Sequence, residues 1–205
     1  MTIKNYVCAG LVGLFGFNVN ECPVNLYESI KKKPIHKKHL GDAVEYHKKL
    51  SYQKIIEKMK VPVQVEWYLQ NYLIPHEHPG NVKSFKKTHQ ERFADCMDAT
   101  LASAIMLYGD GYEPNYLVMW KSSSKIGHAV FYYEKNGLYG SLGINKEDCN
   151  EPKFKTLNNL VDKLGYEKFC KFKVNKDSII SSKEKDQRIL FSKLKKSVCY
   201  DVKKQ

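Results

Sequence analysis

The chain has 205 residues, of which 42% are apolar and 12% aromatic, a composition that can build a buried core and excludes a disordered protein. Its formal net charge is +12, but only two of its 34 basic residues are Arg. Arg makes the bidentate contacts to phosphates and bases, so this Lys-dominated charge argues against a specific nucleic-acid partner. We expect at most a loose, salt-screened attraction to acidic surfaces.

Residues 1–22 contain an apolar stretch from Tyr6 to Val19 that follows Lys4 and is too short to span a bilayer comfortably. The stretch is similar to the apolar region of a secretory signal, although no small-residue cleavage motif follows it. The alternative is a buried helix or strand at the start of a cytoplasmic protein. Export and a cytoplasmic location therefore both stay open, and no later segment reaches membrane-spanning length.

Residues 23–83 are predicted to form a helical region. Apolar residues recur at helical spacing from Asp42 to Lys60, and a second helix is expected from Val63 to Ile74. The loop 75–80 that follows contains His76, Glu77 and His78.

These histidines are interpreted as solvated loop residues, because no second pair of metal ligands is visible. The chain has six cysteines but no Cys-x-x-Cys pair, so a structural zinc site is not expected either. The even number of cysteines permits disulfides without indicating which residues pair. We therefore predict neither a metal nor a cofactor.

Residues 84–175 are predicted to form the core of the protein, and residues 176–205 a basic C-terminal helix or tail. The expected core elements are a helix from Asp95 to Tyr108, strands Tyr116–Trp120, His128–Tyr133 and Leu138–Ile144, a helix over 157–164 and a strand over 169–174. This order predicts an α+β domain in which an antiparallel sheet packs on the helix that carries Cys96.

The most informative residue of the core is Cys96, which lies at the predicted start of a helix. A cysteine attacks as its thiolate, and a helix N-terminus or a nearby imidazolium stabilises that form. His128 opens the strand after a flexible loop, where its side chain can reach the end of the helix. Asp95 and Asp98 match a capping arrangement at this helix start. We therefore predict that Cys96 and His128 form a nucleophile and base pair.

The third member of such a site should orient the imidazole, and the hairpin after His128 supplies the candidates. If Asn136 and Gly137 form a tight two-residue turn, Asn145 lies opposite His128. If the loop has four residues, Gly143 lies opposite and Asn145 is a diagonal neighbour on the same face. Asn145 is within reach in both registers and is the predicted orienting residue. Asp148, just beyond the strand, is the reserve candidate.

At this point the residues resemble a known family. Residues 94–120, ADCMDATLASAIMLYGDGYEPNYLVMW, resemble the nucleophile segment of transglutaminase-like domains, which show Asp-Cys, a further acid, a helix of small residues, a Gly-Tyr and an apolar strand. Residues 127–145, GHAVFYYEKNGLYGSLGIN, look like the matching histidine hairpin. The Asp of that family aligns near Gly143, where no acid stands, so the Cys–His–Asn set is also similar to papain-like peptidases. The resemblance covers about 84–165 and implies a transglutaminase-like, papain-like core.

The resemblance implies acyl transfer, in which Cys96 attacks an amide carbonyl to form a thioester and His128 takes and returns the proton. Water or an amine then resolves the thioester, and hydrolysis is the default. We expect a cysteine peptidase or amidase with a peptide or protein substrate. The alternative is a catalytically inactive domain of the same fold that binds peptides or another protein. Nothing in the sequence indicates an oligomeric state.

Overall fold

The structure, a computed structural model, describes residues 37–78, 81–123, 127–187 and 199–202. The apolar segment 1–22 and most of the helix expected near the C-terminus lie outside these residues. No helix within the described ranges is long and apolar enough to cross a membrane.

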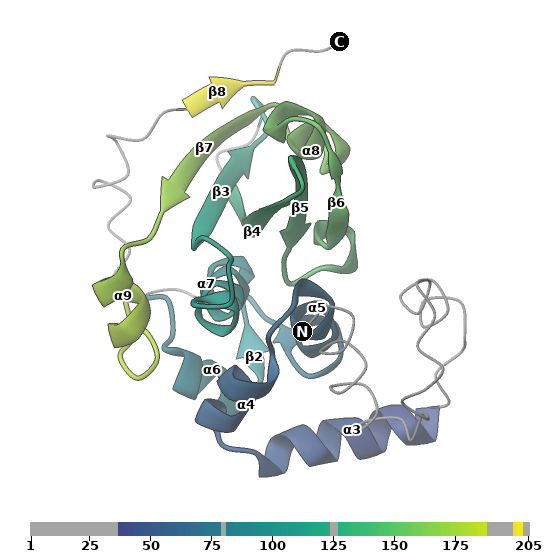
Figure 1. Ribbon diagram of the computed structural model, residues 1–205, viewed down its shortest axis with the longest axis vertical. Coiled ribbons are helices and arrows are strands. Elements are labelled where there is room, and N and C mark those ends of the chain that lie inside the picture. The colour runs from purple at the N-terminus through teal and green to yellow at the C-terminus, as the bar shows by residue number, and fades with distance from the viewer. Residues whose placement is uncertain (1–36, 79–80, 124–126, 188–198, 203–205) are drawn as a thin grey trace.

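An antiparallel sheet of six strands forms one half of the molecule (Figure 1), with the strand order β6-β5-β4-β3-β7-β8. The strands are β3 (Asn115–Trp120), β4 (Gly127–Lys135), β5 (Leu138–Leu142), β6 (Asn150–Phe154), β7 (Lys168–Lys173) and β8 (Cys199–Asp201). A disulfide between Cys170 and Cys199 joins β7 to the edge strand β8. The predicted α+β class and antiparallel sheet are confirmed.

Seven helices accompany the sheet in the described part of the chain. They are α3 (Lys37–Lys49), α4 (Tyr52–Lys58), α5 (Pro62–Asn71), α6 (Phe85–Glu91), α7 (Cys96–Leu107), α8 (Leu157–Lys163) and α9 (Lys176–Ser181). Helices α4 to α7 and α9 gather on one side of the sheet, whereas α8 lies apart from them against β5 and β6 (Figure 1). Helix α7 is the central element, because almost all of its residues are buried and it packs directly on β4.

Two apolar clusters cover the sheet. The larger cluster joins the helices to side chains such as Phe131 of β4 and Leu142 of β5. The smaller cluster joins Leu117 of β3 and Val130 of β4 to Leu160 of α8. Residues 130 and 131 point to opposite faces of the sheet, so adjacent strand residues supply both clusters.

The predicted helix from Asp42 to Lys60 is in fact two helices, α3 and α4. The chain breaks at Ser51, whose hydroxyl accepts a hydrogen bond from the amide of Lys54 at 3.4 Å and so caps α4. The prediction of one helix was wrong because the helical spacing of apolar residues continues from α3 into α4, although the cap at Ser51 starts a new helix there. Two short strands that were not predicted, β1 (Ile74–Pro75) and β2 (Phe93–Ala94), pair in parallel just before α7.

The β4–β5 hairpin has the tight turn expected from its sequence. Asn136 and Gly137 both have positive φ angles, 54° and 73°, and Lys135 pairs with Leu138. The ladder runs from this pair to Phe131 and Leu142, where β5 ends. Beyond Leu142 the chain leaves the sheet. The residues that follow Leu142 therefore do not pair with the start of β4, and their approach to His128 depends on the turn that the chain makes there.

Candidate active site

Cys96 is the first residue of α7, and its thiol is free and partly exposed. Asp95 caps the helix, since its carboxylate accepts hydrogen bonds from the amides of Met97 and Asp98, both at 2.8 Å. The Asp98 carboxylate in turn accepts from the amide of Asp95 at 3.3 Å, which completes the predicted capping arrangement. The sulfur therefore lies at the N-terminal end of a rigid, buried helix.

The first turn of α7 also determines which backbone donors are available near the sulfur. The amides of Met97 and Asp98 already donate to Asp95, and the amide of Ala99 makes the first helical hydrogen bond, at 3.1 Å. Among the described residues, the amide of Cys96 makes none of these hydrogen bonds, and it is a helix-end donor next to the thiol. An oxyanion that forms at a carbonyl attacked by Cys96 would lie close to this amide.

His128 lies at the start of β4. Its Nε2 atom lies 2.9 Å from Oδ1 of Asp148, and Cys96 is near enough to help raise the pKa of the ring. Because Nε2 faces Asp148, Nδ1 is the ring nitrogen that remains available to a second partner. Cys96 and His128 therefore lie near each other, as predicted, and Asp148 contacts the imidazole.

The electrostatics of this group favour a protonated imidazole. Burial alone lowers the pKa of His128, but the hydrogen bond with Asp148 and the electrostatic influence of Asp148 and Cys96 outweigh burial and raise the pKa to about 9. The His128 side chain is only 14% exposed, so water screens these charges weakly. At neutral pH the ring therefore carries a proton between the thiol and the carboxylate.

The residue that contacts the His128 ring is Asp148, not the predicted Asn145. Of the two hairpin registers that the sequence left open, the structure has the one with a two-residue turn, but β5 ends at Leu142 and the chain then turns through η2 (Lys146–Asp148) instead of continuing opposite β4. This turn leaves the Asn145 side chain exposed and carries the carboxylate back to His128. The predicted placement of Asn145 opposite His128 is not found because that prediction extended the β-ladder past the point where the strand ends.

Asp148 is held firmly on its own side of the site. Its second carboxylate oxygen accepts a hydrogen bond from the backbone amide of Asn145 at 2.9 Å, and its carbonyl accepts from the Ser141 hydroxyl at 2.6 Å. It also packs closely against Gly143, where a Cβ atom would lie 2.5 Å from the Asp148 Cβ. The resemblance aligned an acid of the family with Gly143. In this chain the absence of a side chain at Gly143 leaves room for Asp148.

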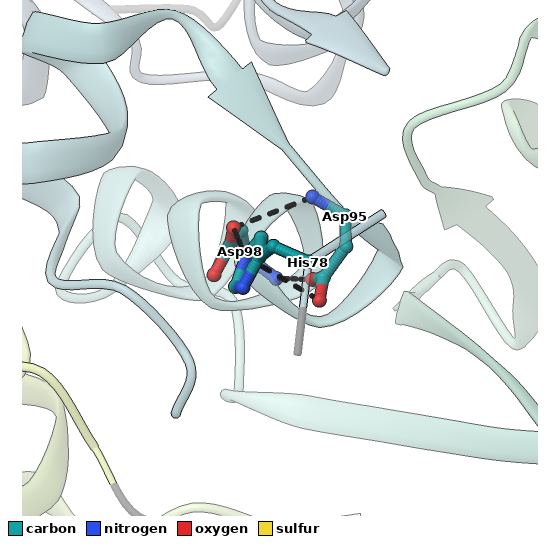
Figure 2. A group of neighbouring side chains, drawn as sticks. All are labelled: His78, Asp95 and Asp98. Atoms are coloured by element: carbon teal, nitrogen blue, oxygen red, sulfur yellow. Dashed lines mark hydrogen bonds and ion pairs between the residues drawn. The ribbon is translucent and has the colours of Figure 1, made fainter. Parts of the chain in front are cut away.

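A second polar cluster surrounds the start of α7. Figure 2 shows His78 beside Asp95 and Asp98, with its Nε2 atom 2.7 Å from an Asp98 carboxylate oxygen and 3.5 Å from one of Asp95. The other Asp98 oxygen accepts from the backbone amide of Lys83 at 2.8 Å. Burial raises the pKa of Asp98, and the hydrogen bond from His78 opposes that rise. His78, which was predicted to be a solvated loop residue, therefore binds the nucleophile helix.

The ligand atoms of this cluster lie within 4.8 Å of one another, close enough for a metal ion. However, both Asp98 oxygens already accept hydrogen bonds, and the Lys83 ammonium lies 3.8 Å from one of them. The neighbouring His76 and Glu77 are exposed and do not join the cluster. We interpret the cluster as structural: its hydrogen bonds hold the segment that ends at His78 against the N-terminus of α7.

The raised pKa of His128 predicts a pH-dependent contribution to stability. The folded pKa of about 9 lies above the ordinary value of 6.5, so the folded state binds the proton more tightly. This contribution, on the order of 3 kcal/mol, is fully present below about pH 6.5 and is lost as the pH rises through about 9. Urea unfolding of the wild type and of His128→Gln, at about pH 6 and about pH 10, should show a larger difference in the free energy of unfolding at the lower pH. The same difference at both pH values would contradict the charge assignment.

Comparison with known proteins leaves the family open. No family model matches the chain, and no curated protein matches it. The interpretation of the site therefore depends on the geometry of Cys96, His128 and Asp148 and on the resemblance of residues 94–120 and 127–145 to a transglutaminase-like nucleophile segment and histidine hairpin.

Proposed function

We propose that the protein is a cysteine-nucleophile acyl-transfer enzyme that hydrolyses a peptide or amide bond through Cys96, His128 and Asp148. The observation that carries this proposal is the imidazole of His128, whose Nε2 atom lies 2.9 Å from the Asp148 carboxylate and whose pKa is raised by both Asp148 and the nearby helix-end residue Cys96. The order of the three residues in the chain and their places on a helix, a strand and the turn after a hairpin support a transglutaminase-like assignment.

The charge state of the imidazole suggests how the reaction starts. A histidine with a pKa of about 9 is protonated at neutral pH, and an imidazolium near a cysteine stabilises the thiolate, which is the form that attacks. The sulfur attacks the carbonyl carbon of the substrate, and the negative oxygen that forms can accept from the amide of Cys96. The His128 proton then passes to the departing amine as the carbon–nitrogen bond breaks, which leaves a thioester and a neutral imidazole.

The second half of the reaction restores the site. Neutral His128 accepts a proton from a water molecule as the water oxygen attacks the thioester carbon. The carbon–sulfur bond breaks, the carboxylic acid leaves, and the Cys96 thiolate is again paired with a protonated His128. Throughout, Asp148 keeps the ring in the orientation that both steps need and stabilises its positive form.

Alkylation by iodoacetamide tests whether Cys96 is an activated thiol. We expect Cys96 to react at neutral pH at least about tenfold faster in the wild type than in His128→Ala, because the imidazolium stabilises the thiolate. Peptide mass spectrometry measures the rate at each cysteine separately. Cys149 is an internal control, since it is a free but buried thiol whose pKa burial raises to about 12.

Acyl transfer itself is tested with p-nitrophenyl acetate. A burst of p-nitrophenol, together with an acetyl group on Cys96 in the intact mass spectrum, would demonstrate the thioester. Both signals should be lost in Cys96→Ala. Equal alkylation of Cys96 in the wild type and in His128→Ala, with no acetylated Cys96, would refute the enzymatic proposal and favour a domain that only binds peptides or proteins.

A further inference from the structure

Tyr166 is a neighbour of the proposed site that the sequence did not indicate. Its ring lies nearly parallel to the imidazole of His128, with an angle of 11° between the planes and 5.8 Å between the ring centres. Burial raises the pKa of the Tyr166 hydroxyl, and the negative charges of Asp148 and Cys96 raise it further. This half-buried aromatic ring thus covers the imidazole and lies within the electric field of both of its partners.

The backbone around Tyr166 is anchored at several points. Helix α8 ends just before Gly165, which has a φ angle of +80°, and the amide of Tyr166 donates back to the carbonyl of Val161 at 3.2 Å. The next amide, of Glu167, donates to the carbonyl of Trp120 at the end of β3, also at 3.2 Å. The ring is therefore held at the end of the sheet where β4 starts with His128.

We propose that Tyr166 is a positioning residue that covers the His128 ring and keeps water from the hydrogen bond between His128 and Asp148. The proposal rests on the proposed function, because it assigns Tyr166 a role in the same site. An aromatic face against a protonated imidazole stabilises the positive charge, and a hydrogen bond sheltered from water is stronger. A stacked ring also limits rotation of the imidazole, so that Nε2 stays toward Asp148.

Substitutions at Tyr166 separate this role from simple packing. Tyr166→Phe keeps the aromatic face, so the rate at which iodoacetamide alkylates its Cys96 should stay within about twofold of the wild-type rate. In Tyr166→Ala the alkylation rate of Cys96 should be about tenfold lower. Tyr166→Leu keeps much of the apolar volume without an aromatic ring. If the alanine variant does not fold, the same rates are measured on the leucine variant instead. Tyr132→Leu is the matched control, since Tyr132 is a partly buried tyrosine of β4 that contacts Tyr139.

The decisive measurement is the NMR titration of His128 in protein with labelled histidine, with the signal identified by its absence in His128→Gln. We expect the pKa of His128 to fall from about 9 in Tyr166→Ala or Tyr166→Leu and to stay in place in Tyr166→Phe and Tyr132→Leu. A His128 pKa that is unchanged or raised in the alanine or leucine variant, because relief of burial outweighs the loss of shielding, or an unchanged alkylation rate, would overturn the proposal. The titration needs neither substrate nor a reactive thiol, so this outcome is distinct from a failure to find acyl transfer in the wild type.

Discussion

Replacement of Asp148 by Asn is expected to slow acetylation of Cys96 by p-nitrophenyl acetate roughly 10³-fold while the protein stays folded. The Asp148 carboxylate accepts the hydrogen bond from His128 at 2.9 Å, and this bond is the largest of the interactions that raise the pKa of the ring. An amide in its place lacks the negative charge and can turn its NH₂ group toward the imidazole. The burst rate and the NMR titration of His128 both measure the effect, and the titration should move to a lower pKa.

Asn145→Ala is the matched control for this substitution. The Asn145 side chain is exposed, and its two hydrogen bonds with Asp148, at 2.9 and 3.1 Å, use the backbone amide and the backbone carbonyl of Asn145, which alanine retains. We expect an acetylation rate within about twofold of the wild type. A larger loss in Asn145→Ala than in Asp148→Asn would restore Asn145 as the orienting residue and would contradict the site described above.

Gly143→Ala is expected to destabilise the protein by about 1–3 kcal/mol and to impair the site at the same time. The added methyl carbon would lie 2.5 Å from the Cβ and 2.8 Å from Oδ2 of Asp148, and the Cβ cannot move without its backbone. The Gly143 carbonyl accepts from the Gln70 side chain at 3.0 Å, which restrains movement of Gly143 itself. The turn that carries Asp148 must therefore shift, which separates the carboxylate from His128.

Gly140→Ala provides a control with a similar steric cost elsewhere. Its added carbon would lie 2.7 Å from the carbonyl oxygen of Asn150 and 2.7 Å from the ring of Tyr133, and none of its three nearest atoms belongs to Asp148. Urea unfolding should show a loss of stability in both variants. Only Gly143→Ala should lose acetylation rate per folded molecule, and parallel losses in the two variants would show that Gly143 has no particular link to the site.

The sequence predicted those parts of the site that depend on local patterns. The cap of Asp95, the helix of Cys96 and the turn at Asn136 and Gly137 are set by residues close together in the chain, and each is found as expected. The proximity of Cys96 to His128 was predicted from the order of a helix and a strand.

The remaining features depend on contacts between distant segments or on where an element ends. Asp148 approaches His128 because β5 stops at Leu142, and residue propensities alone do not specify that end point. His78 reaches Asp98 across 20 positions of sequence, and Tyr166 reaches His128 from the far end of α8. Nothing in the local pattern around His78 or Tyr166 indicates these partners, since each side chain would also suit an exposed loop.

The disulfide between Cys170 and Cys199 affects how any thiol chemistry of this protein can be measured. This bond ties β8, the last described strand, to the sheet. The residue after that strand borders the segment of Tyr166, because the amide of Val202 donates to the carbonyl of Glu167 at 2.7 Å. An assay of the proposed thiol chemistry therefore needs a mild reductant that keeps Cys96 reduced and leaves the bond between Cys170 and Cys199 intact.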